Sequence, residues 1–189
     1  MFVRSLTLGV AAAALLAGGA QAADLIIPTT PQPIYEAAGF NWEGLYVGAR
    51  LGGEFVGDNA IGTGVASSTL GVVGAAVGVN FLPADPLLIG AEVTADYLWN
   101  GDYATGEFFA NLRAGAVVTD NVLVYALGGI GTQTRNGTNT GLYQLGGGLE
   151  VGVTDAVSVR AELVGVGDFA AGGNFFDGAK ATVGVFYHF

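Results

Sequence analysis

The sequence contains no cysteine and little charge, and these two shortages exclude several classes of protein. Without cysteine, the chain of 189 residues forms neither disulfides nor thiolate sites. Charged residues make up 12% of it, whereas roughly 25% is usual for a soluble globular domain. The 6 Lys and Arg residues stand against 16 acidic ones, so the chain lacks the basic face that binding to nucleic acid requires.

Apolar residues and glycine are abundant instead. Hydrophobic residues make up 51% of the chain, and 33 residues are glycine. The length fits a single domain. An apolar, glycine-rich and acidic chain without cysteine predicts strands that face lipid.

The first 22 residues have the pattern of a secretory signal peptide. Arg4 supplies a positive start, residues 6–17 are almost wholly apolar, and Ala20 and Ala22 form a small-x-small cleavage site. The apolar stretch is too short for a transmembrane helix, which needs about 20 residues. We therefore expect residues 1–22 to be removed.

Residues 23–41 follow as an expected periplasmic lead-in. Pro28, Pro31 and Pro33 lie among its polar residues, and proline lacks the backbone donor that a sheet needs. The segment is expected to be extended, either as a tether or as a partial plug for the mouth of a barrel. The outer-membrane β-barrel itself is expected to occupy residues 42–189.

Apolar residues alternate with polar or small ones throughout the body of the chain. In residues 87–99, Ile89 and Val93 share one face, while Glu92 and Asp96 share the other. A membrane strand is about 10 residues with this two-residue period, and the pattern recurs seven more times. It predicts an all-β fold, an eight-stranded antiparallel up-and-down transmembrane β-barrel.

A single spanning helix is a competing interpretation for the uncharged residues 60–84. Gly74 and Gly78 have the spacing of a helix-dimer motif. Glycine weakens a helix, however, and the valines around these two positions favour a strand. The neighbouring segments also alternate in step with this one, which again favours a strand.

An internal repeat and the lengths of the connections predict the orientation. Asp85, Asp120 and Asp155 recur every 35 residues in short turns, and this register assigns Val124 and Ile130 to the outer face of an otherwise ambiguous strand. Bacterial barrels have short periplasmic turns and longer external loops. Both termini are therefore expected in the periplasm. The longer external connections are expected at residues 56–68, 100–106, 132–140 and 167–178.

The charged residues fall mainly into two groups by this alternation. Several acids are expected in the outer loops, among them Asp58, Asp102, Glu107, Asp168 and Asp177. Others are expected inside the barrel, where eight strands leave room only for side chains. We expect a structural lumen ion-pair network of Arg50, Glu92, Asp96, Arg113, Glu150, Arg160, Glu162 and Lys180.

Glu150 and Arg160 are each five residues from Asp155, so they should face each other across a hairpin. Glu92, Arg113, Glu150, Arg160 and Glu162 are expected at similar heights. Glu54 is also expected to point inward. An ion pathway along these charges is the alternative interpretation.

The sequence offers little for catalysis or for a cofactor. His188 is the sole histidine, and its inward neighbours include Ser158 by register. A metal site needs three or four ligands, and the expected outer loops contain no histidine for hydroxyl-based catalysis. We expect neither an enzyme nor a bound cofactor or metal.

Three motifs resemble those of a known family. Residues 41–48 read NWEGLYVG and resemble the W-x-G-x-Y-x-G first strand of small proteobacterial outer-membrane barrels. Residues 153–162 look like their penultimate hairpin, and residues 185–189 look like their C-terminal assembly signal. The family is the opacity-like, or "porin family", group of surface proteins.

The resemblance implies location in the cell outer membrane, with lipid and the barrel assembly machinery as partners. It also implies that Tyr187 and Phe189 belong to the assembly signal. We expect a structural surface protein with a largely closed lumen and acidic external loops. An extracellular ligand of these loops is possible, but the sequence does not identify it. A narrow channel for small solutes is the alternative function, followed by a barrel enzyme acting on lipid.

The mature protein is expected to begin at Ala23, because the apolar stretch before the cleavage site is too short to span the membrane. The intact mass of the species extracted from outer membranes measures this directly. A mass that includes residues 1–22 would contradict the prediction.

Overall fold

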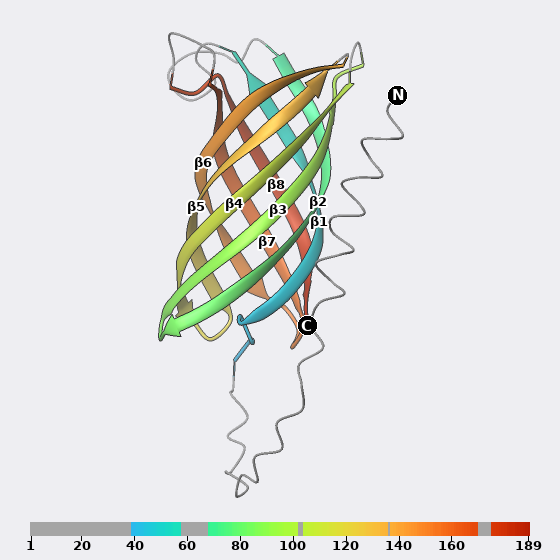
Figure 1. Ribbon diagram of the computed structural model, residues 1–189. Helices are drawn as coiled ribbons and strands as arrows, with labels where there is room; N and C mark the ends of the chain where they lie inside the picture. The colour runs from blue at the N-terminus through green and yellow to red at the C-terminus, as the bar shows by residue number, and fades with distance from the viewer. Residues whose placement is uncertain (1–38, 58–67, 102–103, 136, 170–174) are drawn as a thin grey trace, which may run out of the picture. The chain divides into compact units, whose positions relative to one another are not determined.

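The computed structural model describes residues 39–57, 68–101, 104–135, 137–169 and 175–189, which form one closed β-barrel (Figure 1). Each strand pairs antiparallel with the next, and β8 pairs with β1. The eight-stranded up-and-down barrel predicted from the sequence is therefore confirmed. The strands are β1 Gly44–Val56, β2 Ser68–Ala84, β3 Leu87–Trp99, β4 Ala104–Thr119, β5 Val122–Arg135, β6 Thr138–Gly152, β7 Val157–Asp168 and β8 Gly178–His188.

The expected signal peptide and nearly all of the expected lead-in lie outside the described residues. Within the described ranges, no helix is long and apolar enough to cross a bilayer.

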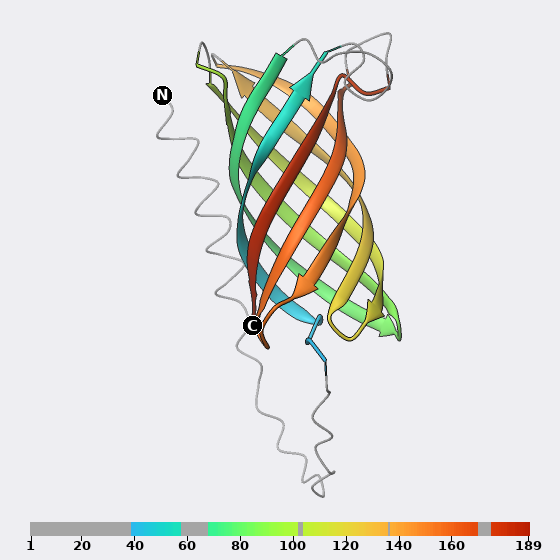
Figure 2. The same ribbon diagram turned by 180° about the vertical axis from the view of Figure 1, so that it is seen from behind.

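The two ends of the barrel differ in their connections. One end, called the turn end, holds the first residue of β1, the last residue of β8 and the short connections around Asp85, Asp120 and Asp155. Figure 2 shows the C-terminus at this end. The opposite end, called the loop end, holds the other four connections.

Two expected loop-end connections are shorter than the sequence suggested. β5 continues to Arg135 and β6 begins at Thr138, and these two residues are paired in the register. β4 likewise begins at Ala104, within the stretch expected to be a loop. The polar composition of both stretches, with four threonines in residues 132–140, suggested loops. Threonine is β-branched, however, and fits a strand well.

The alternation separates an apolar outer face from a packed interior. Leu112 is 73% exposed, whereas its neighbour Arg113 is 2% exposed. The ambiguous strand β5 follows the predicted register, since Val124 and Ile130 are exposed and Leu123 is buried. The outer face carries the large exposed apolar side chains, as a strand facing lipid requires.

Inward-facing glycines make room for the larger side chains of the interior. A Cβ atom at Gly74 would overlap the carboxylate of Asp96, and one at Gly78 would overlap the hydroxyl of Tyr46. Both glycines lie on the inward-facing side of β2. Their missing side chains are therefore a packing requirement of this narrow barrel.

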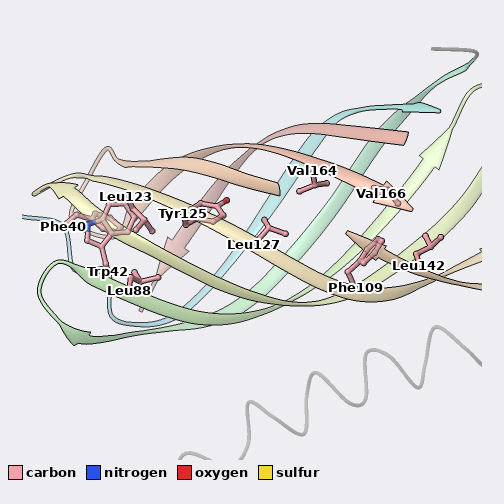
Figure 3. Close-up of a cluster of buried hydrophobic side chains, with 10 residues drawn as sticks. All are labelled: Phe40, Trp42, Leu88, Phe109, Leu123, Tyr125, Leu127, Leu142, Val164 and Val166. Carbon is pink, nitrogen blue, oxygen red and sulfur yellow. The ribbon is translucent and has the colours of Figure 1, made fainter. Parts of the chain in front are cut away.

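Aromatic residues that precede and begin the barrel domain close its turn end. Phe40 is 7% and Trp42 is 2% exposed, and Figure 3 shows both rings grouped with Leu88 and Leu123 at this end of the interior. The Phe40 amide donates to the Asp120 carbonyl oxygen at 3.1 Å. Residues 39–41, the described part of the expected lead-in, thus lie at the mouth of the barrel together with Trp42.

The last residue of the chain completes the seam between β8 and β1. The amide of Phe189 donates to the carbonyl oxygen of Leu45 at 3.0 Å. Its ring is 73% exposed and lies 5.1 Å from the ring of Tyr187 on the outer face.

Deleting Phe189 is expected to lower the fraction of protein that reaches the membrane-inserted, heat-modifiable form, because the deletion removes this seam bond and an outer-face aromatic. The measurement is the heat-induced gel shift of outer-membrane fractions. Phe169→Ala, which removes an exposed aromatic at the loop end, is the matched control. Insertion of the truncated chain at the wild-type level would contradict the prediction.

Candidate functional site

The interior of the barrel contains a network of buried charged side chains. All eight residues expected in the lumen network are at most 6% exposed. Two further acids, Glu54 and Glu107, are buried with them. The ten side chains form two groups, one nearer each end of the barrel.

The turn-side cluster consists of Glu92, Arg113, Glu150 and Arg160. Arg160 donates to Glu92 through Nη1 at 2.5 Å and to Glu150 through Nε at 2.9 Å. Arg113 donates to the same oxygen of Glu150 through Nη2 at 3.0 Å and lies 3.8 Å from Glu92. Two cations thus face two anions, and each arginine contacts both carboxylates.

Neutral polar groups complete this cluster. The Tyr46 hydroxyl donates to Glu92 Oε2 at 2.8 Å and accepts from Arg113 Nη1 at 2.7 Å. On the other side, Ser158 donates to Glu150 Oε1 at 2.5 Å. The Ser158 bond occupies the Glu150 oxygen that the arginines leave open, whereas Tyr46 shares Glu92 Oε2 with Arg160. Both bonds offset part of the cost of burying charge.

The loop-side cluster consists of Arg50, Glu54, Asp96, Glu107, Glu162 and Lys180. Arg50 binds Asp96 with two hydrogen bonds, of 2.9 and 2.6 Å, and Glu162 with a third of 3.0 Å. This two-pronged contact is the strongest arrangement that Arg and a carboxylate adopt.

Lys180 lies at the centre of the acids of the loop-side cluster. Its Nζ contacts Asp96 at 3.1 Å and Glu54 at 3.4 Å, and it also contacts Glu107. Glu107 accepts a further bond, of 3.0 Å, from Gln133. The described members of this cluster are two cations and four anions, so the cluster carries an excess of negative charge.

Tyr125 connects the two clusters. Its hydroxyl donates to Glu162 at 2.7 Å, while Cζ of Arg113 lies 3.9 Å from the centre of its ring. The Arg160 guanidinium similarly lies 3.6 Å from the ring of Phe186. Aromatic faces therefore cover the parts of the arginines that carboxylates do not reach.

Comparisons with known proteins bear on the fold alone. No protein-family model matches the chain, and no curated protein matches it. Among solved structures, it is similar to neisserial surface protein A, with a TM-score of 0.56 and 12% identity over 77% of this chain and 97% of that one. It is also similar to the N-terminal β-barrel domain of Pseudomonas aeruginosa OprF, with a TM-score of 0.50 and 16% identity over 80% and 99%. The fold is that of small outer-membrane β-barrels.

The position of Glu107 corrects the expectation that this residue belongs to an external loop. Glu107 is buried on β4 beside Lys180, because this strand begins at Ala104. The signal was present in the sequence: Glu107 and Arg113 are an even number of residues apart, so both point to one face of a strand. Asp58 and Asp102 lie outside the described residues.

Glu162 also differs from its expected place. It was expected at the height of the Glu150–Arg160 pair, but its hydrogen-bond partners are Arg50 of the loop-side cluster and Tyr125. Arg160 binds Glu92 and Glu150. Glu150 and Arg160 do face each other across the β6–β7 pair, as their spacing predicted.

Ser158, His188 and Glu150 lie together but lack the geometry of a catalytic relay. Nε2 of His188 lies 3.1 Å from Ser158 Oγ and 3.0 Å from Glu150 Oε1, while its Nδ1 has no partner. A relay needs the acid and the hydroxyl at opposite ring nitrogens. Among the described residues, no group of three potential ligands is arranged to hold a metal.

Replacing Arg160 with Ala is expected to destabilise the barrel, because Glu92 and Glu150 each lose a buried partner. Breaking a buried pair costs about 3–5 kcal/mol, and the remaining contacts of both acids with Arg113 place the expected loss at the lower end of that range. The measurement is the free energy of unfolding from urea titrations of refolded protein.

The double variant Glu150→Gln with Arg160→Gln is the matched control, because it removes one charge of each sign. It should recover part of the stability lost in the single variant. Equal stability of the wild type and both variants would show that these side chains are solvated, which contradicts the ion-pair interpretation.

Proposed function

We propose that the chain is a structural surface protein of the outer membrane, of the opacity-like, "porin family" kind, with a lumen too full of side chains to conduct. The observation that carries this proposal is the pair of charge clusters. Their ten members are nearly inaccessible to solvent, and each contacts an opposite charge inside the barrel.

Apolar side chains next to the charge clusters also support a closed lumen. Phe40 and Trp42 are buried at the turn end. Leu70, Val72 and Leu98 form a buried apolar cluster beside the loop-side cluster, where Leu70 is the register partner of Glu54. Apolar side chains thus fill space beside the charges, which is unfavourable for a hydrated path.

The outer face supports a location in the outer membrane. It presents exposed apolar side chains along the strands, with Tyr97 and Trp99 stacked near the loop end and Tyr187 and Phe189 at the turn end. Aromatic residues are typical of the two membrane interfaces. In this proposal the turn end faces the periplasm, and the loop end, with Asp168 at the end of β7 and Asp177 just before β8, faces outward.

This proposal includes no enzymatic activity, bound cofactor or metal. Its partners are outer-membrane lipid, the assembly machinery that inserts barrels, and an extracellular ligand of the loops whose identity is open. The expected signal peptide and periplasmic lead-in remain part of the proposal.

A narrow channel is the second candidate, and one observation favours it. Several buried polar atoms of the clusters, including Glu92 Oε1, Arg113 Nε and Arg160 Nη2, lack a hydrogen-bond partner. Buried groups of this kind are commonly satisfied by internal water. A chain of such waters would provide a path for small ions.

Planar-bilayer recordings distinguish the two candidates. The wild-type protein is expected to show no steady conductance, because the paired charges fill the lumen. Arg160→Ala should produce openings, since it removes a large side chain from the turn-side cluster.

Leu112→Ala, which shortens an exposed outer-face side chain, is the control and should stay silent. Steady, ohmic conductance of the wild-type protein would contradict a closed lumen and favour the channel.

A further inference from the structure

The turn end carries exposed charge of one sign. Glu43, Asp85, Asp120 and Asp155 are exposed there, and the described residues of this end include no Lys or Arg. The side chains lie on separate connections, so the rim as a whole is acidic. Like charges gathered around a concave surface raise the local concentration of cations.

A hollow of about 400 Å³ lies within this rim. Glu43, Asp85 and Asp120 line it, but Asp155 does not. The rest of its lining includes the apolar residues Phe40, Trp42, Leu82 and Val117. Its size falls in the range of about 300–1,000 Å³ that is usual for ligand pockets, and its lining combines apolar surface with anions.

One of the residues that line the hollow, Trp42, has a buried donor without a partner. Trp42 is 2% exposed and lines the hollow, yet its indole Nε1 has no hydrogen-bond partner. An unpaired buried donor is costly. Because the Nε1 atom is shielded from solvent, the Trp42 ring would have to shift before a ligand in the hollow accepted this hydrogen bond.

We propose that this hollow binds a basic peptide segment of a periplasmic partner, one in which Arg or Lys is next to an apolar residue. The acids would pair with the basic side chains, and the apolar lining, including the ring of Trp42, would cover the apolar residue. The proposal uses the orientation given under the proposed function, but binding itself can be measured whichever way the barrel faces.

The lead-in of this chain does not fit the charge of the hollow. Residues 23–38 contain Asp24 and Glu36 and no basic residue. Like charges would repel across the rim. The occupant with complementary charge is therefore a second protein.

Fluorescence of Trp42 provides the test. The chain has two tryptophans, so Trp99→Phe leaves Trp42 as the single reporter in the full-length protein refolded in neutral detergent micelles. The probe is a short peptide of alternating arginine and leucine. Its addition is expected to shift the emission saturably, and the affinity should fall as salt is added.

Two groups of variants in the Trp99→Phe background locate the site. Asp85→Asn with Asp120→Asn should weaken binding about five-fold, since each replaced acid contributes a modest surface ion pair. Glu43→Gln should weaken binding in the same direction. Asp155→Asn is the matched control: it removes an equivalent turn charge at the same end, but outside the hollow, and should leave the affinity nearly unchanged.

Other peptides test the chemistry of the ligand. A peptide with glutamate in place of arginine should not bind, and one with glycine in place of leucine should bind weakly. The proposal is overturned if the arginine–leucine peptide does not bind, if the glycine peptide binds as well as it does, or if Asp155→Asn weakens binding as much as the double variant. Binding of a soluble peptidoglycan fragment instead of the peptide would also overturn it. None of these results changes the conductance expected of the barrel.

Discussion

The hydrogen bonds between β1 and β8 close the sheet on itself, and the rest of the structure depends on this closure. Lipid offers no partner for a backbone amide or carbonyl, so a sheet in a membrane must have no open edge. With only eight strands, the resulting cylinder is just wide enough for side chains. Every inward position is therefore a packing position, and an inward charge must find a partner within the cylinder.

This narrowness explains why the two charge clusters are so interconnected. Arg113 and Arg160 share the carboxylates of Glu92 and Glu150, and no further side chain is needed to balance them. Buried ion pairs are weak evidence for stability, because desolvation offsets much of their attraction. These ion pairs instead help to specify the strand register. A shift of one strand by one residue would turn its charged side chains toward the outer face, which is energetically unfavourable.

The two ends of the barrel are finished differently. At the turn end, Phe40, Trp42 and His188 pack ring against ring, with centroids 4.5 to 5.9 Å apart. At the loop end, Glu54 and Glu107 gather around Lys180 and leave an excess of negative charge. The interior therefore differs between its two ends, because aromatic rings close the turn end and an acidic cluster lies toward the loop end. The outer face is nearly uniform along the barrel axis.

The sequence by itself determined the strand number, the antiparallel order and the face on which each predicted network residue lies, because a two-residue period assigns a side chain without reference to its neighbours. It also determined that Glu150 and Arg160 meet, since a short turn fixes their register. It did not determine that Glu162 pairs with Arg50, that Glu107 lies beside Lys180, or that Tyr125 joins the clusters. The contacts of Glu162 with Arg50 and Tyr125 and of Glu107 with Lys180 cross the lumen between strands that are not hydrogen-bonded to each other. Only the tertiary structure decided them. They depend on the tilt of the strands and on the space left by Gly74 and Gly78, which together bring side chains from distant strands to the same level along the barrel axis.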